Sequence, residues 1–510
     1  MTNVSCCMES EVSRRARSRR WTRAETAAVA VPAALMLVLG LWGVDRGGMW
    51  GDESVSYLVA RRTVPQIWQL LHTVDAVHGL YYLFMHLVLA VHPGEVVLRL
   101  PSVCGAAAAA GLVAALGTRL VRPRVGLWAG LLYAVTPMTG HYAQEGRSYA
   151  LVSAGVAGAT LLLVRALREP REHPWWPYAS LLAVTCLLHE LAVLVLLAHA
   201  ATLALARVGR RVWSGWGRAA GAVVVVLLPL AWVSEGQSGQ VSWLRTPGWP
   251  QVEVLGRSFA AAPEGPVFWG CVLLAAVGLT ARRPAVVALP LLVLPPAVLL
   301  LVSQIQPLYD DRYVLYALAG APLLVAAGAD RLVTVAGRLL PRVPGRPSRR
   351  LVPLGGVVAV AFVFVASLPL QRENRSPDHR PENFAAVSAA VARQARPGDA
   401  VLFLPSFWRV GAQAYPKGFG RARDVALAES GARSGTLSGL EAPPGELRRR
   451  LASVDRVWVV APGYVLKRRW VPSDPVDRLK LDAVEEHFTH VEGFASGRIT
   501  LGLYVRRPRL

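Results

Sequence analysis

Residues 24–43, AETAAVAVPAALMLVLGLWG, and the tetrapeptide Trp50-Gly51-Asp52-Glu53 that follows them decide the fold class of this chain. The first stretch is apolar and long enough to cross the ~30 Å hydrocarbon core of a bilayer as a single helix. The tetrapeptide then places two carboxylates where such a helix would emerge into water. The chain is therefore predicted to be a membrane protein with acidic side chains at the membrane surface.

The composition supports this prediction and excludes one other class of protein. Of 510 residues, 53% are hydrophobic and 17% are charged, and the mean hydropathy is +0.37. Further long apolar runs occur, such as residues 352–370. The net charge is +22, from 55 basic and 33 acidic residues, but the arginines lie mainly between apolar runs, as in loops that face an anionic cytoplasmic leaflet. The sequence thus predicts a polytopic membrane protein and no nucleic-acid partner.

Arginine clusters predict how the chain crosses the membrane. The Arg-rich tail, residues 1–23, precedes an apolar run without a small-residue cleavage site, which is typical of an uncleaved signal anchor with a cytoplasmic N terminus. The other clusters that mark cytoplasmic loops are residues 119–124, 165–171, 207–218, 282–283 and 331–350. The run 175–206 is too long for one helix and is split at His189-Glu190. About eleven spans result, in a multi-pass domain of the cytoplasmic membrane over residues 24–370.

A long first external loop is predicted over residues 45–95. Within it, the apolar stretch 80–91 is shorter than the roughly 17 to 25 residues that a span requires. Counting it as a span would also place the arginines at 119–124 outside. We therefore expect this stretch, together with a helix over residues 53–62, to form juxtamembrane helices.

The composition changes after residue 370, and residues 371–510 are predicted to be a soluble, extracytoplasmic α/β domain. The expected strands are residues 400–404, 456–460 and 499–505, and the expected helices are residues 381–396, 445–454 and 476–488. The five cysteines lie in the N-terminal tail or in apolar runs and indicate no disulfide framework. No zinc-type spacing, phosphate-binding loop or dinucleotide fingerprint is present in the sequence. The predicted fold class is thus a mainly α polytopic membrane protein with a C-terminal α/β domain.

This topology sends most chemically active side chains to the outer ends of the spans, which favours a functional site there. The set comprises Asp52, Glu53, Asp75, His78, Tyr81, Tyr82, Arg99, residues 141–147, His189, Glu190 and residues 310–313. Each member also has a structural interpretation. The acidic pair could cap a helix, the histidines could be hydrogen-bonded at the interface, the tyrosines could belong to an aromatic belt, and the arginines could anchor their helices. Two arginines at one rim, Arg147 and Arg312, would also suit a phosphate group.

The order of these motifs resembles the GT-C glycosyltransferases, within the branch that contains the protein O-mannosyltransferases and the lipid A aminoarabinose transferases. The motifs that carry the resemblance are Trp50 to Glu53, DAVHGLYY at 75–82, RLPS at 99–102, YAQEGRSY at 142–149 and Arg312-Tyr313. The resemblance covers roughly residues 24 to 330. Many relatives have His-Pro-Pro-Leu-Tyr-Tyr where this chain has His78-Gly79-Leu80-Tyr81-Tyr82, and glycine leaves that backbone less rigid.

The resemblance implies an inverting glycosyltransferase with a polyprenyl-phosphate sugar donor and an extracytoplasmic active site, and it favours mannose as the sugar. It implies that Asp52 is the base for the acceptor hydroxyl, with Glu53 supporting it or binding acceptor or metal. The implied ligands of the donor phosphate are Arg147 and Arg312, with Arg61 and Arg99 as weaker candidates. The implied substrate-binding residues are His78, Tyr81, Tyr82, Glu145, Tyr149, His189 and Tyr313. The acceptor stays open among a protein, a glycolipid and a polysaccharide.

Two further questions stay open at this point. An activated lipid phosphate supplies its own leaving group, so no cofactor is required, although a divalent metal could bind at Asp52, Glu53, Glu145, His78 and His189, whose spacing does not decide the matter. A membrane transporter or lipid flippase would also explain many spans, but it would more naturally show paired half-repeats or mid-membrane charges. A noncatalytic scaffold would not explain the ionisable groups gathered at the outer rim.

Overall fold

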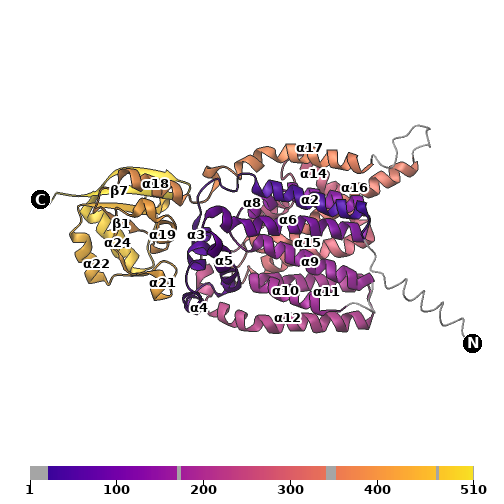
Figure 1. The fold of residues 1–510 in the computed structure, drawn as a ribbon, viewed down its shortest axis with the longest axis horizontal. Helices are drawn as coiled ribbons and strands as arrows, with labels where there is room; N and C mark the ends of the chain where they lie inside the picture. The colour runs from indigo at the N-terminus through magenta and orange to yellow at the C-terminus, as the bar shows by residue number, and fades with distance from the viewer. Residues whose placement is uncertain (1–20, 169–173, 340–351, 467–469, 509–510) are drawn as a thin grey trace, which may run out of the picture.

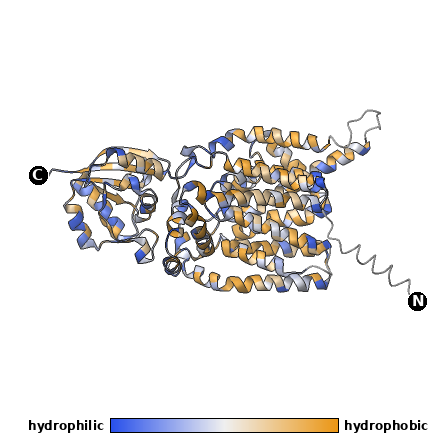
Figure 2. Ribbon diagram, viewed as in Figure 1, coloured by the Kyte–Doolittle hydropathy of each residue, from blue (hydrophilic) through white to orange (hydrophobic). Residues whose placement is uncertain are grey.

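A computed structural model describes residues 21–168, 174–339, 352–466 and 470–508. Most of the Arg-rich tail, and parts of the clusters at 165–171 and 331–350, lie outside the described residues. The chain forms a helical bundle and a smaller α/β domain, with the short helices α3, α4 and α5 between them (Figure 1). The bundle helices are strongly apolar along their length, whereas the α/β domain carries many hydrophilic segments (Figure 2).

Seven helical segments of the described chain are long and apolar enough to cross a membrane. They are α2 (Arg23–Leu41), α6 (Glu95–Leu120), α9 (Tyr149–Arg168), α12 (Arg210–Gly236), α15 (Arg282–Val302), the segment Asp311–Leu339 that joins η4 (Asp311–Ala319) to α16 (Gly320–Leu339), and α17 (Val352–Glu373). Shorter apolar helices complete the bundle: α7 (Pro123–Val135), α10 (Trp176–Leu188), α11 (Val195–Leu205) and α14 (Gly265–Leu279). The chain is a multi-pass membrane protein, and the count of about eleven spans stays a prediction.

Small residues allow the bundle helices to approach closely, which is the usual way in which helices pack in a membrane. On α6, a Cβ added to Gly117 would lie 2.8 Å from the Cα of Gly126 on α7. On the same helix, a Cβ added to Gly105 would lie 2.9 Å from the backbone nitrogen of Leu151 on α9. Helix α6 is therefore packed closely against both α7 and α9. This packing fixes the orientation of the helix, including its start near Arg99.

Two predicted interruptions of the apolar pattern are confirmed. The run 175–206 breaks after α10, where His189 has an extended backbone and η2 (Glu190–Leu194) leads into α11. The first external loop folds into α3 (Gly51–Ala60), α4 (Val64–Leu71), η1 (Ala76–His78) and α5 (Gly79–Val91). These short helices lie at the end of the bundle that faces the α/β domain (Figure 1).

The C-terminal domain is built on a five-stranded sheet of order β2-β1-β5-β7-β6. The strands are β1 (Ala400–Phe403), β2 (Arg423–Asp424), β5 (Arg456–Pro462), β6 (Phe488–Ser496) and β7 (Ile499–Arg506). Strands β2, β1 and β5 run parallel, and β7 pairs antiparallel with both β5 and β6. Alternate residues of β1 and β5 enter two separate apolar cores, one under α18 (Phe384–Gln394), the other under α22 (Pro444–Ala452) and α24 (Pro475–His487).

Three of these strands and three of the helices are confirmed from the sequence, within a few residues at their ends. Strand β2 escaped prediction because it is only two residues long. Strand β6 escaped because it lies at the edge of the sheet, where most of its side chains are exposed and the pattern lacks apolar alternation.

The α/β domain is bonded to the loop that leads into α3. The Tyr415 hydroxyl accepts a hydrogen bond from the backbone N–H of Met49 at 2.6 Å. The Glu382 carboxylate accepts one from the N–H of Gly51 at 3.1 Å. At the other end of α3, the Arg62 guanidinium donates to the carbonyl of Thr436 at 2.8 Å. The C-terminal domain thus helps to fix the segment that carries Asp52.

Candidate active site

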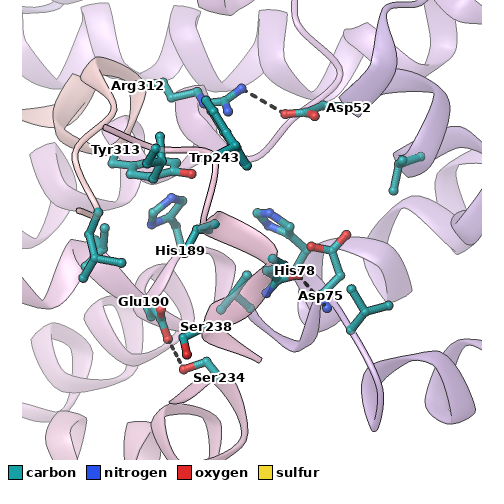
Figure 3. A pocket seen from close by; sticks show the side chains of 18 of the residues that line it. Asp52, Asp75, His78, His189, Glu190, Ser234, Ser238, Trp243, Arg312 and Tyr313 are labelled. Atoms are coloured by element: carbon teal, nitrogen blue, oxygen red, sulfur yellow. Dashed lines mark hydrogen bonds and ion pairs between the residues drawn. The ribbon is translucent and has the colours of Figure 1, made fainter. Parts of the chain in front are cut away.

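A cavity of about 560 Å³ lies where the bundle, the short helices and the α/β domain meet. Its wall includes residues from α3, η1, the start of η2, the end of α12, η4 and the α/β domain. Figure 3 shows Asp52 and Arg312 at one side of this space, with His78 and His189 facing each other across it. Segments far apart in the sequence therefore place ionisable and aromatic side chains around one hollow.

Asp52 is one of four acidic residues that line this cavity, with Asp75, Glu190 and Glu235, and it is the one that lies beside the arginines. Its Oδ2 accepts a hydrogen bond from Arg312 NH1 at 2.9 Å, and Arg147 NH2 lies 4.0 Å from the same oxygen. The Asp52 side chain keeps 27% of its surface exposed. Helix α3 begins without any side-chain capping hydrogen bond, so the interpretation of Asp52 as a helix cap is not supported. The arrangement instead presents one accessible carboxylate beside two guanidinium groups.

Glu53 points the other way and is completely buried. Both of its oxygens accept hydrogen bonds from Arg99 at 2.8 Å, and Oε1 also accepts one from the N–H of Gly146 at 2.9 Å. Burial by itself would raise the pKa of Glu53, but the charge and hydrogen bonds of Arg99 lower that pKa to about 2. Glu53 is thus a permanently charged anchor that holds the first turn of α3 against the loop before α9.

The predicted placement of Arg99 in the donor site is corrected by this geometry. Arg99 is fully buried, and its remaining hydrogen bonds go to the carbonyls of Val44, Gly47 and Gly48. Its guanidinium is therefore enclosed by the loop that precedes α3 and does not line the cavity. Arg61 is also outside the cavity, because it lies on the surface and donates to the Tyr57 hydroxyl at 3.3 Å.

Arg147 links the carboxylate side of the cavity to the histidines. It leaves the turn between α8 (Pro137–Ala143) and α9, donates to Ser56 Oγ at 3.1 Å, and lies 2.5 Å from His78 Nε2. A guanidinium only donates, so His78 Nε2 accepts and the proton of the neutral ring sits on Nδ1. Burial, followed by the charge of Arg147, holds the pKa of His78 well below its usual value, which keeps the ring neutral.

Several buried polar atoms around the cavity have no hydrogen-bond partner within the described residues. They are Nδ1 of His78, Nδ1 of His189, Nε of Arg147, Nε of Arg312 and Oε1 of Glu145. The His189 ring is neutral because burial lowers its pKa to about 3. Unpaired buried donors and acceptors are costly, and a cluster of them beside a cavity indicates a place where a polar ligand completes the hydrogen bonding.

Aromatic rings hold Arg312 in position. Its guanidinium carbon lies 5.6 Å from the ring centroids of Trp50, Tyr149 and Tyr313. The His189 ring is 4.9 Å from Tyr313 and 5.5 Å from Tyr149. Cation–π contacts hold the guanidinium in place without adding a negative charge, while Asp52 at 2.9 Å and Asp310 at 3.4 Å are its anionic partners.

The comparisons with known proteins agree with this architecture. Residues 79–234 match the sequence model of the family described as dolichyl-phosphate-mannose-protein mannosyltransferase. The solved structure of ArnT from Cupriavidus metallidurans in the apo state is similar at a TM-score of 0.58 and 12% identity, covering 94% of this chain and 98% of that one. The structure of the same protein bound to undecaprenyl phosphate is similar at a TM-score of 0.55 and 14% identity, with the same coverage. No curated protein sequence matches the chain.

The chain has the GT-C fold. The resemblance predicted from the order of the motifs is confirmed at this level, and a region of the membrane domain also matches the mannosyltransferase family in sequence.

The GT-C fold brings some of the predicted site residues to the cavity and buries others behind the cavity wall. Six of the residues that the resemblance implies line the cavity, as do Asp75 and Glu190 of the wider predicted set; the six are Asp52, His78, Arg147, His189, Arg312 and Tyr313. Tyr81 is completely buried, and Tyr82 is buried with its hydroxyl bonded to Asp75, so both support η1 from behind. Glu145 is buried 4.0 Å from Arg312, and burial raises its pKa to about 8.

Several residues that complete the wall of this cavity were not predicted from the sequence. They are Trp243 and Leu244 after α12, Gln306 and Leu308 before η4, and Phe407 and Leu437 in the α/β domain. The only signal available was the exposed tryptophan in a loop between apolar runs, which also fits an interfacial aromatic. The contribution of the α/β domain carries no local motif, because it depends on how two domains pack.

The structure offers no ready metal site in the part of the chain that it describes. There, no group of three or more His, Cys, Asp or Glu side chains could hold a metal ion. Asp52 is instead paired with Arg312, and Glu53 with Arg99.

Proposed function

We propose that this chain is an inverting glycosyltransferase that moves a sugar, mannose being favoured, from a polyprenyl-phosphate donor to an acceptor hydroxyl. The observation that carries the proposal is the accessible carboxylate of Asp52 facing a cavity beside Arg147 and Arg312. The family match and a GT-C structure solved with undecaprenyl phosphate support a lipid-phosphate donor. Mannose is favoured because the matching family is described by dolichyl-phosphate-mannose.

Asp52 would act as the base. A hydroxyl is a weak nucleophile until its proton has an acceptor, and a positioned carboxylate contributes about a hundredfold to ten-thousandfold. As the proton moves to Asp52, the acceptor oxygen forms a bond to the anomeric carbon. The bond from that carbon to the phosphate oxygen breaks, and its electron pair leaves with the lipid phosphate. Attack opposite the phosphate inverts the anomeric configuration.

Arg147 and Arg312 would stabilise the negative charge that develops on the departing phosphate. A guanidinium can bind two phosphate oxygens at once, and the two arginines are held with little solvent around them. Such preorganised charge strengthens an electrostatic interaction in a buried site. His78 and His189 are neutral, so they would hydrogen-bond to the sugar or the phosphate without adding charge.

We place this site on the outer face of the cytoplasmic membrane, with the N terminus inside and residues 371–510 outside. The placement rests on the arginine-rich loops, which mark the cytoplasmic side. Two of the described arginines in these loops form ion pairs with Asp330 on α16: Arg122, between α6 and α7, and Arg124, at the start of α7. In our proposal the transfer needs no metal, because the arginines supply the positive charge that a metal would supply.

The decisive experiment measures transfer of radiolabelled sugar in membranes from cells that express the protein. The donors are polyprenyl-phosphate mannose and, separately, polyprenyl-phosphate arabinose, each assayed with and without EDTA. Wild-type protein should transfer label, and Asp52→Asn should lower the rate at least a hundredfold at unchanged expression. Asp45→Asn is the matched control, because it makes the same change at an exposed aspartate of the same loop.

Different results of this assay would contradict different parts of the proposal. Equal transfer by wild type and Asp52→Asn would refute the role of Asp52. No transfer from either donor by a folded protein, with acceptors present, would favour the transporter or flippase alternative. Loss of transfer in EDTA would refute the metal-free mechanism.

A further inference from the structure

The α/β domain supplies part of the cavity wall, and this points to a role beyond covering the bundle. Phe407 and Leu437, from two different loops of that domain, line the same cavity as Asp52. The domain therefore shares the candidate active site, and its two apolar side chains face whatever enters there. The inference drawn from them rests on the proposed function.

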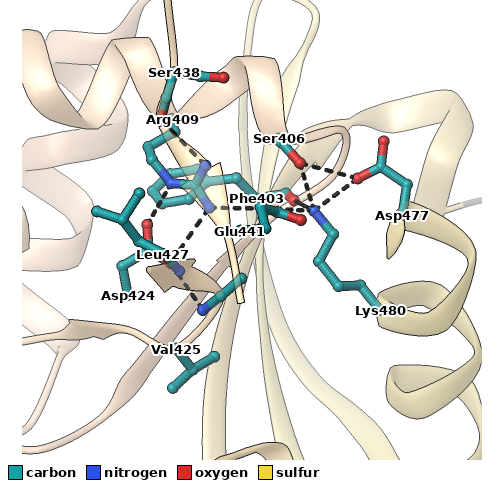
Figure 4. A network of polar contacts seen from close by, with 12 residues as sticks. Phe403, Ser406, Arg409, Asp424, Val425, Leu427, Ser438, Glu441, Asp477 and Lys480 are labelled. Atoms are coloured by element: carbon teal, nitrogen blue, oxygen red, sulfur yellow. Dashed lines mark hydrogen bonds and ion pairs between the residues drawn. The ribbon is translucent and has the colours of Figure 1, made fainter. Parts of the chain in front are cut away.

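The loop that carries Phe407 is fixed by a buried lysine. Ser406 follows the end of β1, and its hydroxyl accepts a hydrogen bond from Lys480 Nζ at 2.8 Å. Lys480 is fully buried and also pairs with Asp477 at 2.7 Å and with Glu441 at 2.9 Å (Figure 4). Because this ammonium group is surrounded by acceptors, it anchors η6 (Ser406–Trp408), the short helix that carries Phe407.

The loop that carries Leu437 is fixed through the same glutamate. Arg409 donates to the carbonyl of Ser438 at 3.2 Å and pairs with Glu441 Oε1 at 2.8 Å. Glu441 Oε1 thus accepts hydrogen bonds from both Arg409 and Lys480 (Figure 4). From the opposite side, Arg62 at the end of α3 donates to the carbonyl of Leu437 at 3.3 Å. Both wall residues are thus held by one network rather than by flexible loops.

Phe407 lies close to the backbone that carries the proposed base, and it lines the same cavity. A Cβ added to Gly51, the residue before Asp52, would lie 3.8 Å from Phe407 Cε1. The arginine side of Asp52 is taken by Arg312 and Arg147, where we place the donor phosphate. Because the arginines would hold the donor phosphate, we place the acceptor against another part of the cavity wall, the part that Phe407 and Leu437 supply.

The remaining lining shows which kind of acceptor fits. Phe407 keeps 37% of its surface exposed, and Trp243, from the loop after α12, keeps 61% exposed. The cavity also presents the neutral side chains of Ser238, Gln240 and Gln306 and the acidic side chains of Asp75, Glu190 and Glu235, which can accept hydrogen bonds from sugar hydroxyl groups and disfavour an anionic acceptor. Aromatic faces cover the C–H faces of a sugar ring, while amides and hydroxyls bond to its hydroxyl groups. This combination suits a neutral saccharide, whether it belongs to a glycolipid or to a polysaccharide.

We propose that Phe407 and Leu437 form the acceptor wall of the active site and select a neutral saccharide as the acceptor. The α/β domain is then a specificity element of the enzyme, and the network around Glu441 positions it.

The test uses the full-length protein in nanodiscs, with the active donor and three probe acceptors: free dimannoside, octyl dimannoside and a serine- and threonine-rich peptide. Phe407→Ala and Leu437→Ala should each raise the KM for the dimannosides about tenfold and leave the KM for the donor unchanged. Phe407→Tyr should restore the wild-type KM, because it keeps the ring. Tyr464→Ala and Leu440→Ala are the matched controls, since these exposed residues of the same domain do not line the cavity.

Three results would overturn the inference. Unchanged acceptor KM values in both alanine variants would show that the wall does not contact the acceptor. Parallel changes in the KM for donor and acceptor would show only a structural role. Preference for the peptide would refute a saccharide acceptor.

If wild-type protein neither transfers sugar nor consumes donor, the proposed function itself fails. That result is distinct from active transfer that is insensitive to changes at Phe407. Preference between free and octyl dimannoside separates a polysaccharide from a glycolipid source.

Discussion

Asp52 and Arg312 are 260 residues apart in the sequence and are joined by an ion pair of 2.9 Å in the cavity. The proposed base and a proposed phosphate ligand therefore neutralise each other before any substrate is bound. The Asp52 oxygen Oδ2 is occupied by the hydrogen bond from Arg312. A donor phosphate that draws Arg312 towards itself would leave the Asp52 oxygens free to accept a proton.

The first prediction concerns the order of binding. We expect the lipid-linked donor to bind before the acceptor, because the donor phosphate releases Asp52 from Arg312. Initial-rate kinetics with the product polyprenyl phosphate as inhibitor will check this. Inhibition should be competitive against the donor and noncompetitive against the acceptor. Random-order kinetics would contradict the idea that the ion pair controls the base.

The second prediction concerns the geometry of Arg312. Arg312→Lys keeps the positive charge but loses the planar fork that holds two oxygens. We expect kcat to fall by about a hundredfold or more, as when a preorganised donor is removed from an active site. Single-turnover transfer of labelled sugar will separate this step from substrate binding. Arg61→Lys, on the surface outside the cavity, should retain wild-type kcat.

The third prediction concerns the buried pair of Glu53 and Arg99. Arg99→Met leaves the Glu53 charge unpaired and should cost about 3 to 5 kcal/mol of stability. The pKa of Glu53 is lowered on folding, so its stabilising effect is present above the ordinary pKa of 4.5 and is lost as the pH falls towards 2. Thermal unfolding in detergent between pH 6 and about pH 3 will measure this loss. A Glu53→Gln variant should be less stable at pH 6 and less sensitive to acid.

The fourth prediction concerns Glu145 and alkaline pH. Burial raises the pKa of Glu145 to about 8, so its carboxyl group is neutral below that pH and becomes charged above it. A charged Glu145 would attract Arg312, whose NH1 lies 4.0 Å away, and would compete with the donor phosphate. We expect transfer to decline above pH 8 in the wild type and to persist in Glu145→Gln. Identical pH–rate profiles for the two proteins would refute this role.

Most of the membrane fold was accessible from local patterns in the sequence. Long apolar runs predicted the bundle helices because each run must satisfy its backbone hydrogen bonds inside the membrane. The short helix at 80–91 was predicted from its length and from the arginines at 119–124, and the break in the run 175–206 was predicted from its length; the helix and the break are both confirmed. The strands at 400–404 and 456–460 were predicted because residues 400–404 and 457–460 are buried on both faces of the sheet and are therefore apolar.

The candidate site was predicted only where a residue's role follows from its place along one helix. Asp52, Arg147 and Arg312 lie near span ends, and the structure places all three at the cavity. Arg99 lies near a span end too, but which way an arginine points depends on its partners, and Glu53 together with three carbonyls turns Arg99 inward. Phe407 was out of reach because its role depends on the packing of two domains.

The hydrogen bonds from Met49 and Gly51 to the α/β domain have a consequence for the biosynthesis of the protein. The loop that carries Asp52 is translated well before its partners, because Tyr415 and Glu382, which accept those bonds, lie 366 and 331 residues further along the chain than Met49 and Gly51. Until then two backbone N–H groups of the loop lack their partners, and the loop has less reason to adopt its final shape. The segment that carries Asp52 therefore reaches its final hydrogen bonding only after the α/β domain has been synthesised.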